Sequence, residues 1–360
     1  MTGIYFHIPF CAKKCPYCDF FSVPYRRETV ERYVDALIRN VGQYSVTEPV
    51  DSIYFGGGTP SLLRPEQVEA VLDACVKRFP VQPDAEITLE YNPTGKRDDY
   101  LKTLRKIGVN RLSIGTQSFS DEQLRILGRT HTAADNRRAV LAAHEAGFED
   151  LSCDLMLATP DQTAEVLEST LAALTDLPIS HVSAYMLQVE EGTPLSRDAV
   201  LLERCPDDDA TVDRYLQAVR TLEAAGLKQY EVSSFARDGR RSVHNLKYWQ
   251  CEPYLGIGAG AHSCFGGKRF CVPKDIGAFM QAARQPEEVL DANPLDREER
   301  LMLGLRLTDG VPESALSERA RRILPKLTEV GDIRRTDKGR IALTAKGFAV
   351  SNAVIAALLE

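Results

Sequence analysis

Short runs of strand-forming residues alternate with helical patterns through the first half of the chain, and this alternation limits the fold more than any other feature. Strands are expected at residues 4–8, 52–55, 86–91, 111–115, 151–155 and 181–187, with helices between them at residues 29–44, 64–79, 100–107, 135–146 and 163–174. Such alternation is typical of βαβ units and a parallel sheet. Six repeats over residues 1–190 predict an α/β fold with a partial (β/α)6 barrel, whose sites lie at the C-terminal ends of the strands.

The alternation stops after Leu187, which predicts a smaller α+β part in the second half. The pattern there indicates a helix at residues 207–225, a glycine-rich irregular stretch at 254–267, a helix at 319–330, a hairpin with strands at 333–335 and 341–343, and one apolar helix at 345–359. The hairpin and its helices predict a winged-helix-like tail. We therefore expect three domains, at residues 1–190, 191–295 and 296–360.

Charge and hydropathy exclude several classes of partner. The net charge of −7 speaks against a general nucleic-acid surface, and no apolar run approaches the length of a membrane span. The opening residues lack the basic head and apolar core of a signal peptide, so we expect a cytoplasmic protein with reduced thiols.

Three closely spaced cysteines near the start of the chain form the strongest local motif. Cys11, Cys15 and Cys18 have the spacing CxxxCxxC. Three thiolates can hold three corners of a 4Fe-4S cluster and leave one iron open to a small ligand. The alternative is a structural zinc site, with His7 or Asp19 as the fourth ligand. The other cysteines are scattered and are expected to be ordinary packing residues.

Further polar groups are expected at the mouth of the barrel. Gly56, Gly57, Gly58 and Thr59 follow the second strand, and consecutive glycines let backbone amides approach a charged ligand. The later strands and loops contribute two acids, an amide and a guanidinium, namely Glu90, Asp154, Gln117 and Arg129. Such a set suits a zwitterion that carries a ribose.

With these motifs the chain resembles the radical S-adenosylmethionine (SAM) superfamily, and within it the porphyrin-related branch. The resemblance implies a radical SAM barrel in which SAM chelates the open iron of the cluster through its amino and carboxylate groups. It also implies the SAM-binding positions, which are Tyr5, Tyr17, Gly56, Gly57, Gly58, Thr59, Glu90, Gln117, Arg129, Asp154, Tyr185 and Leu187. The chain departs from the pattern at Ala158-Thr159-Pro160, usually Gly-Leu-Pro, and at Cys153, which affects details of cofactor contact.

Two members of that branch are distinguished by other residues. The oxygen-independent coproporphyrinogen III dehydrogenases have a further cysteine where this chain has Phe20, and a longer arm before the cluster loop. The HemW-type heme chaperones carry HNxxYW, which matches His244-Asn-Leu-Lys-Tyr248-Trp249. The resemblance therefore implies a heme site at His244, Tyr248 and Trp249, with His262 as a second candidate ligand.

The sequence thus favours a cytoplasmic heme chaperone that carries a SAM-coordinated 4Fe-4S cluster and transfers heme to acceptor proteins. Family resemblance also implies dimerisation when the cluster is loaded. Two alternatives stay open: a coproporphyrinogen III dehydrogenase or another tetrapyrrole-modifying radical SAM enzyme, and a zinc-stabilised barrel without a redox role.

Overall fold

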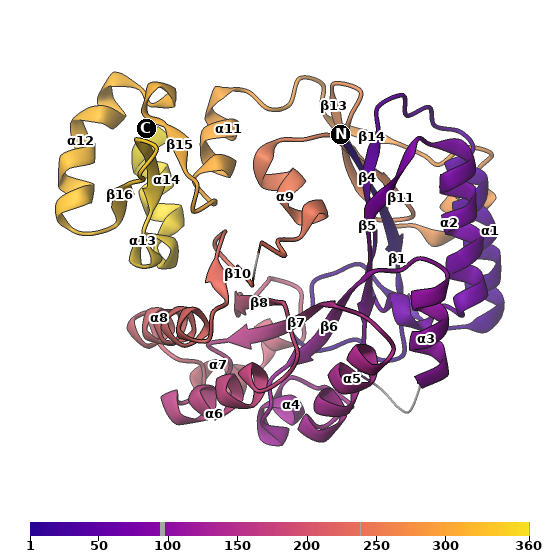
Figure 1. The fold of residues 1–360 in the computed structure, drawn as a ribbon, viewed down its shortest axis with the longest axis horizontal. Coiled ribbons are helices and arrows are strands. Elements are labelled where there is room, and N and C mark those ends of the chain that lie inside the picture. The colour runs from indigo at the N-terminus through magenta and orange to yellow at the C-terminus, as the bar shows by residue number, and fades with distance from the viewer. Residues whose placement is uncertain (94–97, 238, 360) are drawn as a thin grey trace.

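The computed structural model describes residues 1–93, 98–237 and 239–359. A long curved sheet carries helices along its outer face, and a small C-terminal unit lies beside one end of it (Figure 1). The strands of the large sheet are β1 (Thr2–Ile8), β4 (Val50–Gly57), β5 (Val81–Tyr91), β6 (Arg111–Gln117), β7 (Asp150–Leu157), β8 (His181–Met186), β9 (Lys228–Gln229), β10 (Ser234–Ala236), β11 (Tyr254–Ile257), β12 (His262–Phe265), β13 (Lys268–Cys271) and β14 (Glu288–Asp291).

The remaining elements surround this sheet. Two short strands, β2 (Phe10–Cys11) and β3 (Val23–Pro24), pair with each other, and β15 (Val311–Pro312), β16 (Ile333–Arg335) and β17 (Arg340–Leu343) form a small separate sheet. The α-helices are α1 (Arg27–Val41), α2 (Pro65–Arg78), α3 (Asp98–Lys106), α4 (Asp121–Ile126), α5 (Ala133–Glu145), α6 (Ala164–Thr175), α7 (Ala199–Glu203), α8 (Asp208–Ala224), α9 (Val243–Gln250), α10 (Ile276–Gln281), α11 (Arg297–Gly304), α12 (Glu318–Glu329), α13 (Ala345–Ala349) and α14 (Ser351–Leu359).

The predicted partial barrel is confirmed, and the structure adds a strand to it. The strand order β11-β1-β4-β5-β6-β7-β8 is parallel throughout, and six of these strands are the predicted ones. The strand β11 comes from the second half of the chain and pairs with β1, with Tyr5 opposite Gly256. Antiparallel strands extend both ends of the sheet, β10 and β9 beyond β8 and β12 to β14 beyond β11.

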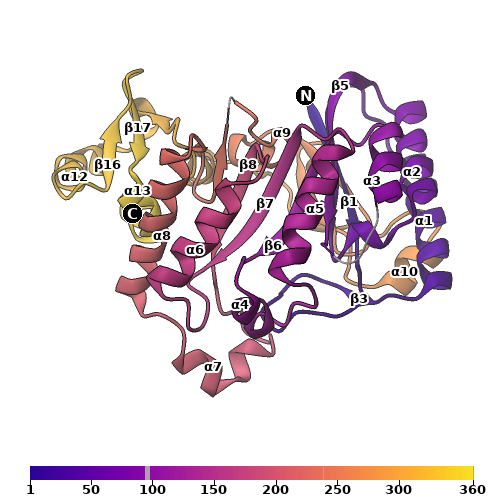
Figure 2. The same cartoon turned by 60° about the horizontal axis from the view of Figure 1, so that its bottom comes forward.

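Apolar and polar side chains separate between the two faces of the sheet. Helices α1, α2, α3, α5 and α6 cover its outer face (Figure 2), and the predicted apolar face of α1 is buried there. Every second residue of the strands faces the other way, and several of these are small polar residues on the inner face. The buried ones include Ser52, Thr88, Ser113, Ser152 and Ser183. A barrel lined in this way offers hydrogen bonds in its interior, in contrast with barrels filled by branched apolar side chains.

Two predictions for the second half are wrong. The stretch at residues 254–267 contains β11 and β12, and its glycines conceal the strand pattern. Gly256 is required because a Cβ there would lie 2.2 Å from the carbonyl oxygen of His262, where the chain doubles back. The expected single helix at residues 345–359 is divided at Val350 into α13 and α14.

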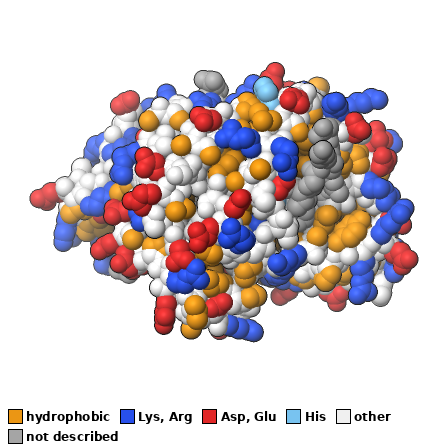
Figure 3. All heavy atoms as spheres, turned by 90° about the horizontal axis from the view of Figure 1, so that it is seen from below, with side chains coloured by type: hydrophobic (Ala, Val, Ile, Leu, Met, Phe, Trp, Pro, Cys, Tyr) orange, Lys and Arg blue, Asp and Glu red, His pale blue; other side chains and the backbone are white. Residues whose placement is uncertain are grey.

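The predicted tail hairpin is present as β16 and β17, with β15 as a third strand and α12 before it. Residues 191–295 contribute strands to the large sheet, so this segment continues the sheet of the barrel. The domain boundaries remain predictions. Within the described residues, no helix is long and apolar enough to cross a membrane. Acidic and basic side chains are interspersed on the face seen in Figure 3.

The junction between β1 and β11 depends on one buried hydroxyl. The Tyr33 hydroxyl on α1 donates to the His7 carbonyl oxygen (3.0 Å) and accepts from the Ala259 amide (2.8 Å). We expect Tyr33→Phe to lower the free energy of unfolding by about 1–3 kcal/mol, because it leaves two buried backbone groups unpaired. Denaturant unfolding of the variant measures this loss. Tyr25→Phe, at an exposed ring, is the matched control, and equal stability of both variants would contradict the prediction.

Candidate cluster and cofactor site

The cysteine loop begins at the end of β2 and is anchored by backbone hydrogen bonds. Cys11, Cys15 and Cys18 are free and half-buried, and the Cys18 amide donates to the Cys15 carbonyl oxygen at 3.2 Å. Among the described residues, no three cysteine, histidine or acidic side chains lie close enough together to hold a metal ion.

Two groups from other elements donate to these thiols. The Thr59 hydroxyl, after β4, lies 3.6 Å from the Cys11 sulfur, and Nη1 of Arg129 lies 3.5 Å from the Cys15 sulfur. A hydroxyl and a guanidinium both stabilise a thiolate, which is the form that binds iron. The donor set therefore fits an iron–sulfur cluster. Of the two candidate zinc ligands, Asp19 is exposed, and His7 is buried with its ring nitrogens paired to the Tyr5 hydroxyl and the Phe21 carbonyl oxygen.

Gly56 and Gly57 at the end of β4, and Gly58 directly after it, leave no room for side chains. A Cβ on Gly56 would lie 2.9 Å from both the Tyr5 and Tyr54 rings, and one on Gly58 would lie 2.8 Å from the Phe10 carbonyl oxygen. Gly57 has φ +112°, which favours glycine, and a Cβ there would lie 2.6 Å from the His7 ring. These glycines therefore let Tyr5, His7 and Phe10 pack directly against the backbone at the C-terminal end of β4.

Glu90, near the end of β5, faces this glycine stretch. Its carboxylate accepts from the Gly57 amide (3.0 Å) and from the Tyr54 hydroxyl (3.1 Å). Burial and the negative charge of Asp154 raise the pKa of Glu90 to about 7. Burial likewise raises the pKa of Asp154 to about 6, while the Ser113 hydroxyl donates to it at 3.0 Å. Two neighbouring carboxylates with raised pKa values suit a cationic ligand.

Arg129 supplies the positive charge at the same mouth. Its Nη2 donates to the Gly115 carbonyl oxygen at 2.9 Å and to the Asn92 side chain. The pairing of β6 with β7 shifts in register before Gln117, which has φ 62°. The side-chain amide nitrogen of Gln117 lies near Gly115. The structure therefore brings Cys15, Arg129 and Gln117 to one edge of the sheet.

The remaining predicted SAM positions lie along the same rim. The Tyr5 ring packs against Gly56, and the Tyr5 hydroxyl pairs with Nδ1 of His7 at 3.1 Å. Tyr17, in the cysteine loop, lies beside Arg129. Tyr185 on β8 is 42% exposed, and the Leu187 amide donates to the Leu157 carbonyl oxygen beyond the strand. Asp154 was expected at a strand end but lies within β7.

His244 is buried below this site. Its Nδ1 pairs with the Ser52 hydroxyl and its Nε2 with the Tyr248 hydroxyl, both at 3.0 Å. Burial, with Lys247 and Arg111 nearby, lowers the pKa of His244 to about 3, so the ring is neutral. In this conformation the imidazole offers no free nitrogen to an iron. His262 lies apart on β12, exposed, on the side of His7.

Buried charges hold α9, the helix of the HNxxYW motif. The Glu86 carboxylate from β5 accepts from the amides of Val243 and His244, at 2.8 and 3.0 Å. Lys247 is buried and pairs with Asp51 at 2.7 Å and Glu252 at 2.9 Å. The helix is therefore held in a fixed orientation against the sheet, and its next-to-last residue is Trp249, which is partly buried.

Sequence reasoning missed several residues of the site. Tyr54, Asn92 and Ser113 each bond a predicted group directly, and Glu86 fixes α9. The alternation within the strands signals that Tyr54 and Ser113 share a face with their partners. For Glu86 the partner lies far along the chain, so no local pattern indicates it.

Comparison with known proteins agrees with this geometry. Residues 5–174 match the family model of the radical SAM superfamily. The structure also resembles that of coproporphyrinogen III oxidase (HemN) from Escherichia coli, a radical SAM enzyme, with a TM-score of 0.80 and 22% identity, covering 99% of this chain and 89% of that one. The fold and the cysteine loop are those of a radical SAM protein, a family that implies a 4Fe-4S cluster and SAM.

Individual relatives identify the family within the radical SAM proteins. The heme chaperone HemW of Lactococcus lactis is 35% identical over 98% of this chain and 96% of its own length. HemW of Bacillus subtilis is 34% identical over 100% and 99%, and HemW of Escherichia coli is 42% identical over 72% and 69%. The chain belongs to the HemW family.

The raised pKa of Glu90 gives a test of the site without any ligand. A carboxyl whose pKa is raised on folding holds its proton more tightly when folded, so stability falls as pH rises from 4.5 towards 7. We expect Glu90→Gln to unfold at higher denaturant concentration than wild type at pH 8 and to show a flatter dependence on pH. The gain should be about 1–2 kcal/mol, because the neutral amide also accepts weaker hydrogen bonds.

Denaturant unfolding between pH 5 and pH 8 checks this expectation. Glu69→Gln, at an exposed position on α2, is the matched control and should follow wild type at each pH. If the free energy of unfolding of Glu90→Gln changed with pH in parallel with that of wild type, folding would not disfavour the ionised form of Glu90, and the prediction would be wrong.

Proposed function

We propose that this protein is a heme chaperone that binds heme, carries a SAM-coordinated 4Fe-4S cluster and transfers heme to acceptor proteins. The observation that carries the proposal is the similarity along nearly the whole chain to two proteins named heme chaperones. The cysteine loop, the paired acids and the motif helix α9 supply the matching chemistry. Their arrangement supports a cofactor site and a separate heme region.

Cys11, Cys15 and Cys18 would hold the cluster, and Thr59 and Arg129 would stabilise the two thiolates that they contact. The cluster would supply an open iron to which SAM binds. Around it, Glu90 and Asp154 suit the cationic part of SAM, and Arg129 suits its carboxylate. The glycine stretch, Gly56 to Gly58 with Thr59, would border the ligand beside Glu90, and Tyr5, Tyr17, Gln117, Tyr185 and Leu187 would complete the rim.

The heme region involves the two ends of α9. Trp249 lines a cavity between α9, α11 and the small C-terminal sheet. His244 and Tyr248 pair with each other and hold the helix against β4. We therefore infer that Trp249 contacts heme and that His244 positions the helix. The proposal includes a cytoplasmic location, where thiols stay reduced, and a dimer promoted by the loaded cluster.

A second candidate is a tetrapyrrole-modifying radical SAM enzyme, which the HemN-like fold favours. The two functions differ in what happens to SAM. An enzyme would cleave SAM in proportion to a porphyrin substrate, whereas a chaperone would bind and release heme unchanged. Anaerobic incubation of the reconstituted protein with SAM and coproporphyrinogen III, followed by analysis of both, separates them.

The cluster is tested by replacing one of its thiols. After anaerobic reconstitution, we expect Cys15→Ser to lose most of its bound iron and sulfide and its brown colour, because a serine oxygen is a poor ligand for this cluster. Iron and sulfide analysis with visible absorbance measures the loss. Cys205→Ser, at a half-buried cysteine outside the loop, should retain the cluster. Zinc in place of iron in the anaerobically purified wild type would contradict the proposal.

Anaerobic heme titration tests the chaperone proposal itself. We expect a saturable Soret shift in the cluster-loaded wild type. For His244→Ala we expect a stability loss of about 2–4 kcal/mol, weaker heme binding and an unchanged Soret position at saturation, because a positioning residue is lost and no axial ligand changes. His144→Ala, at an exposed position on α5, is the control. A displaced Soret maximum would instead identify His244 as a ligand, and no specific binding by wild type would overturn the proposal.

A further inference from the structure

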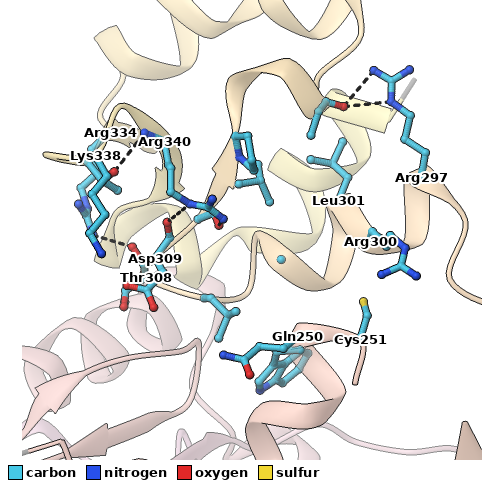
Figure 4. A pocket seen from close by; sticks show the side chains of 18 of the residues that line it. Gln250, Cys251, Arg297, Arg300, Leu301, Thr308, Asp309, Arg334, Lys338 and Arg340 are labelled. Carbon is cyan, nitrogen blue, oxygen red and sulfur yellow. Dashed lines mark hydrogen bonds between the residues drawn. The ribbon is translucent and has the colours of Figure 1, made fainter. Parts of the chain in front are cut away.

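A cavity of about 1000 Å³ lies between the end of α9, the helix α11 and the strands β15 to β17 (Figure 4). Its size is at the upper end of ordinary ligand sites. The cavity is separate from the cysteine loop and the rim of acids. It adjoins the motif helix, since Trp249, Gln250 and Cys251 form part of its wall.

Positive charge dominates the lining. The described lining residues include five cationic side chains, Arg297, Arg300, Arg334, Lys338 and Arg340, against two carboxylates, Asp309 and Asp337. Asp309 is already paired with Arg241 at 3.2 Å, outside the cavity. Within the residues that the structure describes, none of these five side chains forms a salt bridge with a carboxylate. Their charge is thus available to an anionic ligand.

The guanidinium groups are held by backbone carbonyl oxygens, which fix their position and leave their charge uncompensated. Arg300 donates to the Leu295 carbonyl oxygen at 2.8 Å, and Arg297 donates to that of Ala315 at 3.0 and 3.1 Å. On the other side of the cavity, Arg334 donates to the Thr308 carbonyl oxygen at 3.0 Å. Figure 4 shows Arg297 and Arg300 on one side and Arg334, Lys338 and Arg340 on the other.

The two sides differ in their acids. Asp309 and Asp337 lie with the hairpin arginines, whereas no lining carboxylate belongs to α11 among the described residues. Glu299, next to Arg300, is paired with Arg269. Arg297 and Arg300 are three residues apart and so share one face of α11. They also lie in its first turn, where the helix dipole disfavours cations. An anionic ligand bound between them would offset this unfavourable charge.

The wall beside these arginines is apolar. Trp249, Leu301 and Leu307 line it, and a flat aromatic ring packs well against a flat macrocycle. Figure 4 shows the Cys251 side chain rising from the end of α9 towards Arg300. An apolar wall with two cations one helical turn apart suits a large flat ligand that carries two carboxylates on neighbouring arms.

We propose that the heme macrocycle lies in this cavity against Trp249 and Leu301, with its two propionates bound by Arg297 and Arg300. The inference rests on the proposed function and deepens it, because it assigns the heme carboxylates to α11 and the macrocycle to the end of α9. It also gives the C-terminal unit a part in binding, through the lining residues that it contributes.

Anaerobic titration of the full-length, cluster-loaded protein tests the site with two probes, heme and heme dimethyl ester. The ester has the same ring and iron but no carboxylates. For wild type we expect the ester to bind at least about 10-fold more weakly than heme, the difference that a charge-assisted hydrogen bond typically makes. Arg300→Glu should weaken heme binding by a similar factor and leave ester binding near the wild-type value. The matched control is Arg322→Glu, at an exposed arginine on α12 outside the cavity.

The outcomes separate this inference from the proposed function. If wild type binds heme and ester equally, or if Arg300→Glu weakens both ligands equally, the propionate site is not on α11, although the chaperone proposal stands. If wild type binds neither ligand specifically, the chaperone proposal itself fails. Trp249→Leu provides an independent check, since it should weaken heme and ester alike if the macrocycle packs there. Unchanged binding of both ligands by this variant would overturn the placement of the ring.

Discussion

The carboxylate of Glu86 is the interaction on which the arrangement of the site depends. It extends from β5 and accepts the first two amides of α9, which belong to a segment far along the chain. The first amides of a helix have no partner within it and need such an acceptor, and a carboxylate there also suits the helix dipole. Because α9 is held in this way, one helix lies between the start of β4, at Asp51 and Ser52, and the C-terminal unit.

This helix brings the two candidate ligand regions into a continuous set of contacts. The Tyr54 ring lies 5.2 Å from the His244 ring, and its hydroxyl donates to Glu90 at the SAM rim. His244 in turn pairs with Tyr248, next to Trp249 at the wall of the cavity. His244, at the centre of this set, is fully buried and has both ring nitrogens hydrogen-bonded, so its loss would affect contacts on both sides.

The sequence predicted the parts of this structure that depend on local pattern. Six strands and the helices between them follow from apolar periodicity, because each element buries one face against its neighbours. The strand β11 escaped prediction because Gly256 interrupts its pattern and Gly258 follows it directly, and both glycines are required by contacts with distant backbone atoms. The same reason explains the role of Glu86 and the burial of His244. Both depend on which residues meet across the sheet, and a motif such as HNxxYW does not show whether its histidine is exposed or enclosed.

The pairing of β1 with β11 has a consequence for the order in which the protein matures during synthesis. The strand that precedes the cysteine loop acquires its second neighbour only when residues 254–257 have left the ribosome, which takes on the order of tens of seconds after β1 at usual rates. Until then the Tyr33 hydroxyl lacks its Ala259 donor, and Gly260 cannot pack against Phe21 in the loop. In the nascent chain the cysteine loop therefore lacks the support of these two contacts. A cluster delivered to the finished protein would meet a loop supported from both sides.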